Sequence, residues 1–377
     1  MHELSRRSAL VGLLGAAGTL AAGCTGQPTP STSGSETPPV SGSPTPSPSP
    51  SIDTRPRWPL SGKLLKNADD AAHAPVAVKV PDNRNEHPQR GLDDADIVFV
   101  ELDGYRDPAG FSSTRLVPVF HSKLAPAVGP VRSIRPVDIP LLSPMHALIG
   151  NTGATGWVLN YVKHYGSFLE GMLSYMNTKG TGSYSIDPAR VRVYQGTTYY
   201  DRAVLCHPKA LAKVSKKFRD GPPQVYFPFG DAKVASTVSG STARSISVPW
   251  KSGNSYNMSY TWNENSGTWL RSMPWGPHRL ADGTRVAPDN VLVIRAKQHY
   301  AKIYTGSGHA EPIHDIIDTS GPFHYFHGGK FVTGVWTKGS VEEPFGFTLD
   351  DGSPLSMAPG QTYVELPNKG AKIVIKS

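Results

Sequence analysis

Three arginines in the N-terminal half, Arg115, Arg132 and Arg135, have the side chains best suited to bind an anion in this sequence. Arg132 and Arg135 lie in the stretch Gly129–Pro136, whose two prolines restrict the backbone on either side. Planar guanidinium groups pair bidentately with phosphate or carboxylate. The stretch therefore predicts a site for an anionic ligand, and we assign the polar residues Asp82 and Asn83 to the same site.

Internal ion pairing is the alternative role of these arginines. Arg132 and Arg135 are three residues apart, so on an extended chain they point to opposite faces, and only a bend between them makes them converge. Each guanidinium would then stabilise the fold instead of a ligand. The carboxylates available as internal partners are Asp82, Asp96, Glu101 and Asp138.

Acid and base groups in the same region raise the question of catalysis. Asp82, Glu101 and His121, with Asp103 nearby, have the groups that hydrolysis of a glycoside or phosphodiester requires. The sequence gives no distance between them, so whether the protein is an enzyme stays open. A structure in which Asp82, Glu101 and His121 converge would favour a hydrolase over a binding protein.

Other chemical motifs are weaker. The segment His309–Asp315 contains metal-ligating residue types, but a proline interrupts the helix that a His-Glu-x-x-His zinc site needs. We therefore predict no metal site and no cofactor, since nucleotide-binding glycine motifs and a serine nucleophile elbow are also absent. Cys206 follows an apolar run and precedes His207, which predicts a buried thiol and no nucleophile–base pair.

The elements that carry these residues are mainly strands. Short β-branched or aromatic runs predict strands over 75–80, 96–102 and 115–120. Glycine-containing turns predict hairpins over 260–269 and 323–335, and a continuous apolar run predicts a strand over 290–296. Helices are predicted over 156–164 and from Pro208 toward Phe218, and Asp187-Pro188 is typical of a helix start.

The division of the chain follows from composition. A polar stretch over 230–242 marks a boundary, and the predicted fold class is α+β. We expect an N-terminal mixed α/β domain over residues 60–229 and a smaller, mainly antiparallel β domain over residues 230–377. About 320 folded residues fit two domains of ordinary size.

The first 59 residues have the pattern of an exported, lipid-anchored protein. Arg6 and Arg7 precede a short apolar run that ends in Ala-Ala-Gly-Cys24, which predicts a lipoprotein signal peptide over 1–23 and acylation (palmitate-type) at Cys24. The arginine pair favours twin-arginine export, with the general secretory route as the alternative. Residues 24–59 are rich in Pro, Ser and Thr and predict a disordered tether. The expected location is the extracytoplasmic face of the cell membrane.

The formal net charge is +8. A basic protein held outside the membrane meets anionic lipid head groups and acidic wall polymers. No basic stripe with interleaved aromatic residues is present, so we predict no nucleic-acid partner.

Several stretches together resemble a known family. They are the segments 82–98, 114–115, 120–122, 129–135, 266–273, 290–293, 334–338 and 359–362. With these segments the chain resembles the YerB-like family of bacterial lipoproteins, which is built on domain of unknown function 3048 and a C-terminal companion domain. The resemblance implies a lipoprotein with two domains and implies no reaction.

The sequence is consistent with two candidate functions. The first is a cell-envelope lipoprotein that binds an anionic envelope ligand, either a wall polymer, a lipid phosphate or an envelope protein, through the arginines. The second is an extracytoplasmic hydrolase or transferase acting on a wall glycan or phosphodiester. A binding protein needs an exposed basic surface, whereas a hydrolase needs two acid–base groups within roughly 5–10 Å of each other.

Overall fold

One large mixed sheet organises the protein. The structure, a computed structural model, describes residues 55–106, 112–220, 223–250 and 256–377, and residues 53–377 form one compact unit. Eleven strands make the main sheet, with β2 (Val80–Pro81) paired to β4 and β20 (Gly346–Leu349) paired to β19. The other nine follow in the order β10 (Ser241–Thr242), β19 (Lys330–Lys338), β18 (Thr319–His327), β15 (Asn290–Ile294), β21 (Thr362–Glu365), β3 (Ile97–Arg106), β4 (Ser112–Phe120), β1 (Val76–Val78) and β5 (Leu148–Gly150).

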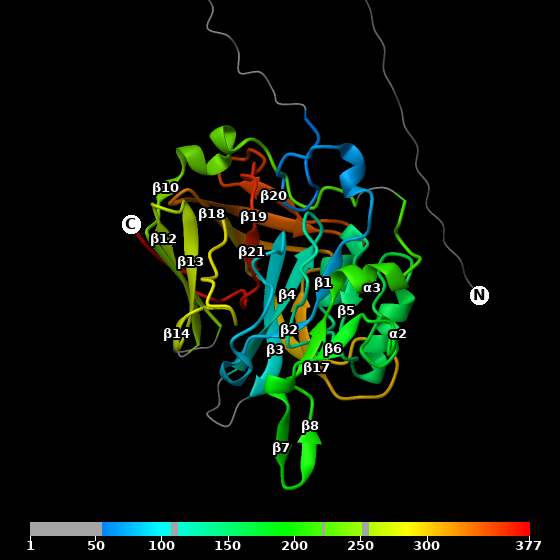
Figure 1. The fold of residues 1–377 in the computed structure, drawn as a ribbon. Coiled ribbons are helices and arrows are strands. Elements are labelled where there is room, and N and C mark those ends of the chain that lie inside the picture. Colours follow the sequence, from blue (N-terminus) through cyan, green and yellow to red (C-terminus); the bar gives the residue numbers. More distant parts are fainter. Residues whose placement is uncertain (1–54, 107–111, 221–222, 251–255) are drawn as a thin grey trace, which may run out of the picture. The chain divides into compact units, whose positions relative to one another are not determined.

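The main sheet combines the two halves of the sequence. Strands from residues 76–150 form one side and strands from residues 241–365 form the other, and they meet where β21 runs parallel to β3 (Figure 1). Buried strands need apolar residues on both faces. Both sides meet this condition, since Val98 and Phe99 of β3 and Tyr363 and Val364 of β21 have no solvent exposure.

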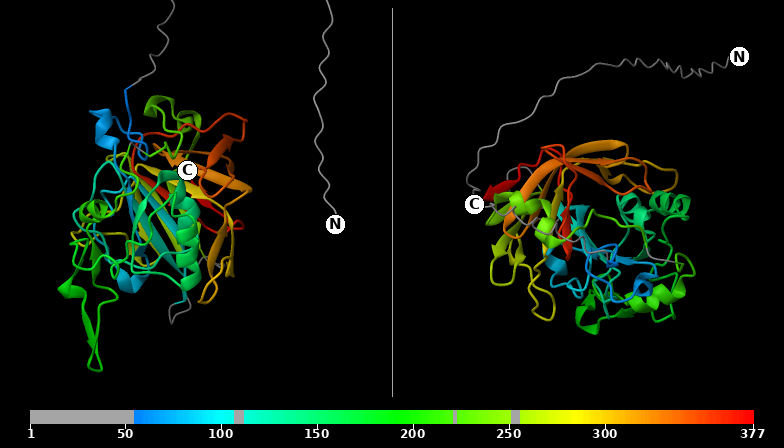
Figure 2. Two further views of the ribbon diagram at one scale, coloured as in Figure 1. Left: turned by 90° about the vertical axis from the view of Figure 1, so that its right-hand side faces the viewer. Right: turned by 90° about the horizontal axis from the view of Figure 1, so that it is seen from above.

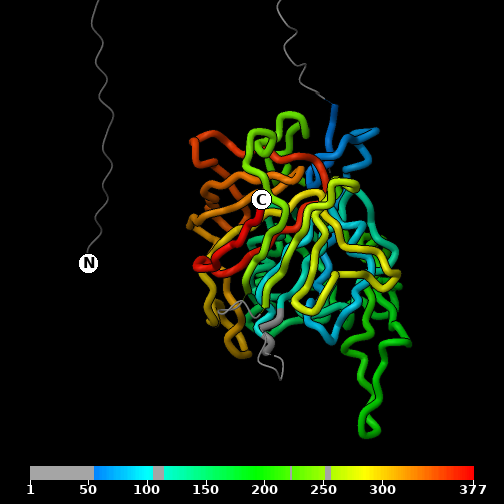
Figure 3. The backbone as a smooth tube through the Cα atoms, turned by 90° about the vertical axis from the view of Figure 1, so that its left-hand side faces the viewer, coloured from blue at the N-terminus to red at the C-terminus, as the bar shows by residue number. Residues whose placement is uncertain are grey.

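A second, five-stranded sheet covers one face of the main sheet (Figures 1 and 3). Its inward side chains alternate along β13, where Trp269, Arg271 and Met273 are buried, as expected for a half-buried antiparallel strand. Its strands follow in the order β14 (Gly276–Pro277), β13 (Thr268–Met273), β12 (Asn257–Asn263), β11 (Ser245–Pro249) and β22 (Val374–Lys376).

Helices and small hairpins complete the unit. Helices α2 and α3 lie on the side of the main sheet away from the five-stranded sheet (Figures 1 and 2). The helices are α1 (Asp138–Leu142), α2 (Gly156–His164) and α3 (Pro208–Val214). The two-stranded pairs are β16 (Lys297–Ala301) with β17 (Glu311–Asp315), β6 (Tyr184–Ile186) with β9 (Val204–Cys206), and β7 (Arg192–Tyr194) with β8 (Thr197–Tyr199).

Most predicted elements are confirmed, with changes at their ends. The helix over 156–164 and both predicted hairpins are present, and Asp187 accepts a hydrogen bond from Ala189 N–H at the start of the short 3₁₀ helix Pro188–Arg190. The helix at Pro208 is shorter than predicted. It ends at Val214, so Phe218 lies beyond it and packs against the ring of His146.

The fold class is α+β with a predominance of strands, as predicted. The boundary between residues 229 and 230 stays a prediction. β10, just beyond this boundary, pairs with β19, and the halves share the main sheet. Within the described ranges, no helix is long and apolar enough to cross a membrane.

Candidate functional site

Asp82, a predicted site residue, is buried between the two sheets. Arg271 Nη2 on β13 lies 2.7 Å from Asp82 Oδ2, and Thr114 Oγ1 donates to the same oxygen at 2.9 Å. Burial alone would raise the pKa of Asp82, but the Arg271 charge and the hydrogen bond from His87 outweigh it and hold that pKa well below its usual range. An ionised carboxylate therefore faces a guanidinium inside the core.

Arg271 also approaches a second buried carboxylate, Glu365 at the end of β21. Its Nε lies 3.8 Å from Glu365 Oε1. Trp250 Nε1 and Tyr260 OH donate to the two oxygens of Glu365 at 2.7 and 2.5 Å. We call Asp82, Arg271 and Glu365 the Arg271 network. It connects β2, β13 and β21, and so fastens the five-stranded sheet to the main sheet.

Asp82, His87 and His278 form the one group of potential metal ligands found in the described part of the chain. Its donor atoms are already engaged. His278 Nδ1 accepts from Arg271 Nη1 at 2.7 Å, and His278 Nε2 donates to Gln89 Oε1 at 2.8 Å. A cation here would stand against the Arg271 guanidinium, which Coulomb repulsion disfavours. These residues therefore suit the ion-pair network better than a metal site.

A second buried charge group surrounds Lys79, between β1 and β2. Its ammonium pairs with Glu101 and lies 2.6 Å from Asp138 Oδ1, and none of the three side chains is exposed. Burial, followed by the Asp138 charge, raises the pKa of Glu101 to about 8, although Lys79 opposes this change. Burial therefore favours the protonated form of Glu101. We call these three residues the Lys79 cluster.

The Arg271 network and the Lys79 cluster lie on opposite faces of the main sheet. Val100 pairs in register with Glu365, so both point to the face that the five-stranded sheet covers. Glu101, the next residue on β3, points to the other face because successive side chains alternate along a strand. The two carboxylates proposed for acid–base chemistry, Asp82 and Glu101, are thus separated by the sheet.

His121, the third candidate catalytic residue, lies elsewhere. It follows β4, six residues beyond Arg115, which corresponds to about 20 Å along a strand. Its Nε2 lies 3.0 Å from the carbonyl oxygen of Ala71, and its ring packs edge-on against Trp58. Burial and the neighbouring His73 lower the pKa of His121 to about 4, so the imidazole is neutral. The structure does not bring His121, Asp82 and Glu101 together.

Two of the three predicted arginines are largely buried and paired internally. Arg115 pairs with Asp103 and donates to the carbonyl of Ser133 at 2.6 Å. Arg135 Nη2 lies 3.0 Å from Asp103 Oδ1, and Arg135 Nε lies 3.5 Å from Glu311 Oε2. The internal partners are therefore Asp103 and Glu311, which differ from the four carboxylates that the sequence offered.

Arg132 belongs to a different and more exposed group. It pairs with the buried Glu86 and lies 3.6 Å from Asp201 Oδ2, and its side chain is 24% exposed. Arg202 reaches the same two carboxylates at 3.4 and 4.0 Å. Asn83, the other predicted site residue, precedes the 3₁₀ helix Arg84–Glu86. Its backbone carbonyl accepts a hydrogen bond from Glu86 N–H at 2.9 Å, which positions Glu86 for both arginines.

Three further arginines surround this pair. Arg192 Nη2 lies 2.9 Å from Asp201 Oδ1, and Arg90 Nη2 lies 3.7 Å from Asp187 Oδ2. Arg190 donates to the carbonyl of Glu86 at 3.2 Å. Five arginines thus stand against three carboxylates, an excess of two positive charges. We call this group the arginine face: Arg90, Arg132, Arg190, Arg192 and Arg202, with Glu86, Asp187 and Asp201.

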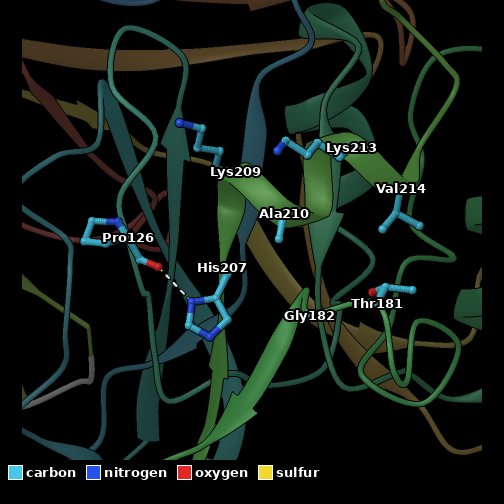
Figure 4. Close-up of a pocket in the computed structure, with 8 residues that line it drawn as sticks. All are labelled: Pro126, Thr181, Gly182, His207, Lys209, Ala210, Lys213 and Val214. Atoms are coloured by element: carbon cyan, nitrogen blue, oxygen red, sulfur yellow. Dashed lines mark hydrogen bonds between the residues drawn. The ribbon is translucent and has the colours of Figure 1, made fainter.

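A shallow cavity of about 620 Å³ lies at α3 (Figure 4). Lys209 and Lys213 of α3 contribute to its rim, and no carboxylate is among its lining residues. His207 Nδ1 lies 2.8 Å from the Pro126 carbonyl oxygen and His207 Nε2 lies 2.9 Å from Ser185 Oγ. Cys206 beside it is fully buried, as predicted, and burial raises the pKa of its thiol.

Several residues of these groups were not predicted from the sequence. Arg271 had one local signal: it occupies an inward position of an alternating strand, between Trp269 and Met273. Of the arginine face, only Arg132 was predicted from the sequence. Its other members are distributed over residues 86–202, and only the fold brings them together. Cys24, the predicted acylation site, lies outside the described residues.

Two family models match most of the described chain. A model described as "Protein of unknown function (DUF3048) N-terminal domain" matches residues 60–206, and the corresponding C-terminal domain matches residues 246–364. The chain belongs to the DUF3048 family. The residues of the arginine face lie within the match to the first DUF3048 domain, and Arg271 and Glu365 lie in and directly after the match to the second.

Two comparisons with individual proteins also show similarity to this chain. The chain is 24% identical over 313 residues to "Putative lipoprotein YerB" of Bacillus subtilis (strain 168), covering 82% of this chain and 85% of that protein. The crystal structure of YerB protein from Bacillus subtilis is similar with a TM-score of 0.66 at 19% identity, covering 85% of this chain and all of the other. The second comparison shows that the two proteins share a fold.

Proposed function

We propose that this chain is a lipid-anchored protein of the extracytoplasmic membrane face that binds an anionic envelope ligand through the arginine face. The lipid anchor is supported by the Ala-Ala-Gly-Cys24 sequence and by similarity to a protein named as a lipoprotein. Acylation at Cys24, export by the twin-arginine route and the Pro-rich tether over 24–59 belong to this proposal.

The excess of arginine over carboxylate on a partly exposed surface is the observation that carries the binding function. Glu86 and Asp201 hold Arg132 and Arg202 in place, which reduces the entropy lost when a ligand binds. A guanidinium has five N–H donors, so arginines fixed by one or two carboxylate contacts retain donors for phosphate or carboxylate groups. Arg115 lies next to this surface, because it donates to the carbonyl of Ser133, the residue after Arg132.

A binding measurement tests the proposal. The full chain, solubilised in non-ionic detergent, should bind anionic polymer extracted from bacterial cell walls, and binding should weaken as salt screens the charges. Arg192→Gln and Arg202→Gln should each weaken binding by roughly 10-fold or more, since a charge-assisted hydrogen bond contributes about 1.5–3 kcal/mol. Because both side chains are partly exposed, the unfolding temperature should change little.

Arg244→Gln is the matched control. Arg244 is also an exposed arginine in an ion pair, with Glu264 at 3.1 Å, but it belongs to the five-stranded sheet region. If Arg244→Gln weakens binding as much as Arg202→Gln, general charge attracts the polymer and the arginine face is not a site.

A further inference from the structure

The β7–β8 hairpin projects from the unit beside the arginine face (Figures 1 and 2). All residues from Arg192 to Tyr200 are exposed. Tyr194 and Thr197 are paired across a two-residue turn, in which Gln195 and Gly196 have φ values of 48° and 74°. Positive φ at both turn residues is typical of a tight type I′ hairpin, so the turn fixes the register of the two strands.

This register places two tyrosines and one arginine on the same face of the hairpin. Arg192 pairs with Tyr199 and Tyr194 pairs with Thr197, whereas Val193 pairs with Thr198 on the opposite face. Tyr194 and Tyr199 are diagonal neighbours, about 7–8 Å apart at the backbone. The Arg192 guanidinium lies 5.8 Å from the centre of the Tyr199 ring.

The tyrosine-bearing face continues directly into the arginine face. Arg192 belongs to both, because it pairs with Asp201, and Asp201 in turn lies 3.6 Å from Arg132. A ligand that contacts the two tyrosine rings therefore reaches the guanidinium groups without leaving the surface. Tyr194 is 64% and Tyr199 is 41% exposed, so both rings are accessible to a ligand.

We propose that the ligand of the arginine face is an anionic glycan whose sugar rings stack on Tyr194 and Tyr199 while its anionic groups pair with the arginines. The proposal rests on the function proposed above and names its ligand class. A tyrosine has a flat apolar ring face and a hydroxyl that stays hydrated, which suits a sugar ring with its apolar C–H face and polar rim.

Two other kinds of partner fit this surface less well. A stable protein–protein interface needs about 800 Å² from each partner and a non-polar core, and two tyrosine rings supply little of that core. An interfacial membrane anchor uses Trp, Phe or Leu beside its basic residues, and none of these occurs in residues 192–200. The described chain also begins, in blue, at the end of the unit opposite the hairpin (Figure 1).

The test compares probes that separate sugar from charge. The full chain in non-ionic detergent is measured against anionic glycan from bacterial cell walls, against sodium polyphosphate, which has charge and no sugar, and against mixed micelles of the same detergent with phosphatidylglycerol. Tyr194→Ala and Tyr199→Ala should each weaken glycan binding about five- to tenfold and leave polyphosphate binding unchanged. Val193→Ala, on the opposite face of the same hairpin and 70% exposed, is the matched control and should change binding less than twofold.

The outcomes separate this inference from the proposed function. If Arg202→Gln weakens glycan binding but both tyrosine variants bind like the native protein, the arginine face stands and the glycan inference is overturned. If neither class of variant affects binding, or no anionic probe binds, both proposals fail. Stronger binding to the phosphatidylglycerol micelles than to glycan, lost in the tyrosine variants, would identify a lipid surface and overturn the glycan assignment.

Discussion

Arg271 and Asp82 are 189 residues apart in the sequence, and their side chains meet at 2.7 Å in the core between the two sheets. Asp82 follows a strand of the main sheet and Arg271 lies on the five-stranded sheet. The pair lies where the two DUF3048 segments are in contact. It is therefore an internal bond between these segments, and Asp82 is not available to a substrate.

Removing the arginine should be costly. Arg271→Met leaves Asp82 and Glu365 buried without their common cation, and we expect the free energy of unfolding to fall by about 3–5 kcal/mol. Urea denaturation measures the change. Arg244→Gln, at a surface pair, should cost less than about 1 kcal/mol. Equal losses in both variants would contradict a special role of Arg271.

The Lys79 cluster predicts a specific pH dependence. Because the pKa of Glu101 is about 8 in the folded protein and near 4.5 in the unfolded chain, the folded state binds this proton more tightly. Stability from this group is fully present below about pH 4.5 and is lost as the pH rises through 8, at up to about 1.4 kcal/mol per pH unit.

Glu101→Gln should flatten that part of the profile. The glutamine stays neutral, so the difference in unfolding free energy between variant and native protein should shift in favour of the variant from pH 5 to pH 8. Subtracting the two profiles removes the contribution of the buried histidines to the pH dependence, because these histidines titrate in both proteins. Glu264→Gln, at a side chain 77% exposed, should leave the slope unchanged. A Glu101→Gln profile parallel to the native one would show that Glu101 is ionised throughout.

Cys24→Ala tests the anchor. Without a thiol the lipid cannot be attached, so the protein should appear in the medium or stay unprocessed at its precursor size. Fractionation followed by mass measurement distinguishes the two. If the variant remains with the membrane at its mature size, another feature anchors the protein.

Limited proteolysis tests the tether. Protease should cut within residues 25–59, whose composition predicts no folded structure, and leave a resistant fragment that begins near residue 60. Mass spectrometry locates the cuts. Early cuts spread through residues 96–193 would contradict the compact unit.

Local patterns predicted local structure well. The hairpin between β12 and β13 and the helix α2 follow from turn residues and apolar periodicity that lie within about ten residues. The parallel pairing of β21 with β3 could not be predicted in this way, because no short-range signal specifies which distant strand a buried apolar run will join. The two-domain layout was predicted from composition alone, which carries no information about the pairing of β21 with β3.

The candidate site was predictable only in part. Arg132 was identified from its proline-restricted stretch, and its group with Arg192 and Arg202 exists because the fold brings residues 86, 132 and 201 together. Asp103 rather than Asp82 pairs with Arg115 because Asp103 lies on the same face of the sheet as Arg115, two positions beyond Glu101. The sequence shows that Glu101 and Asp103 lie on the same face of their strand. Which face Arg115 shares depends on the register between the two strands, and that register is a property of the tertiary structure.

The place of β21 also bears on how the protein is made. This strand, Thr362–Glu365, lies in the middle of the main sheet between β15 and β3, although every other strand of that sheet is synthesised before it. Until it emerges from the ribosome, β3 and β15 each have an open edge, and an open edge invites pairing with other chains. The nascent polypeptide must therefore stay protected from aggregation until residues 362–365 have emerged and paired. A transport machinery that accepts only folded proteins could export this chain only after this short strand has been synthesised and has paired.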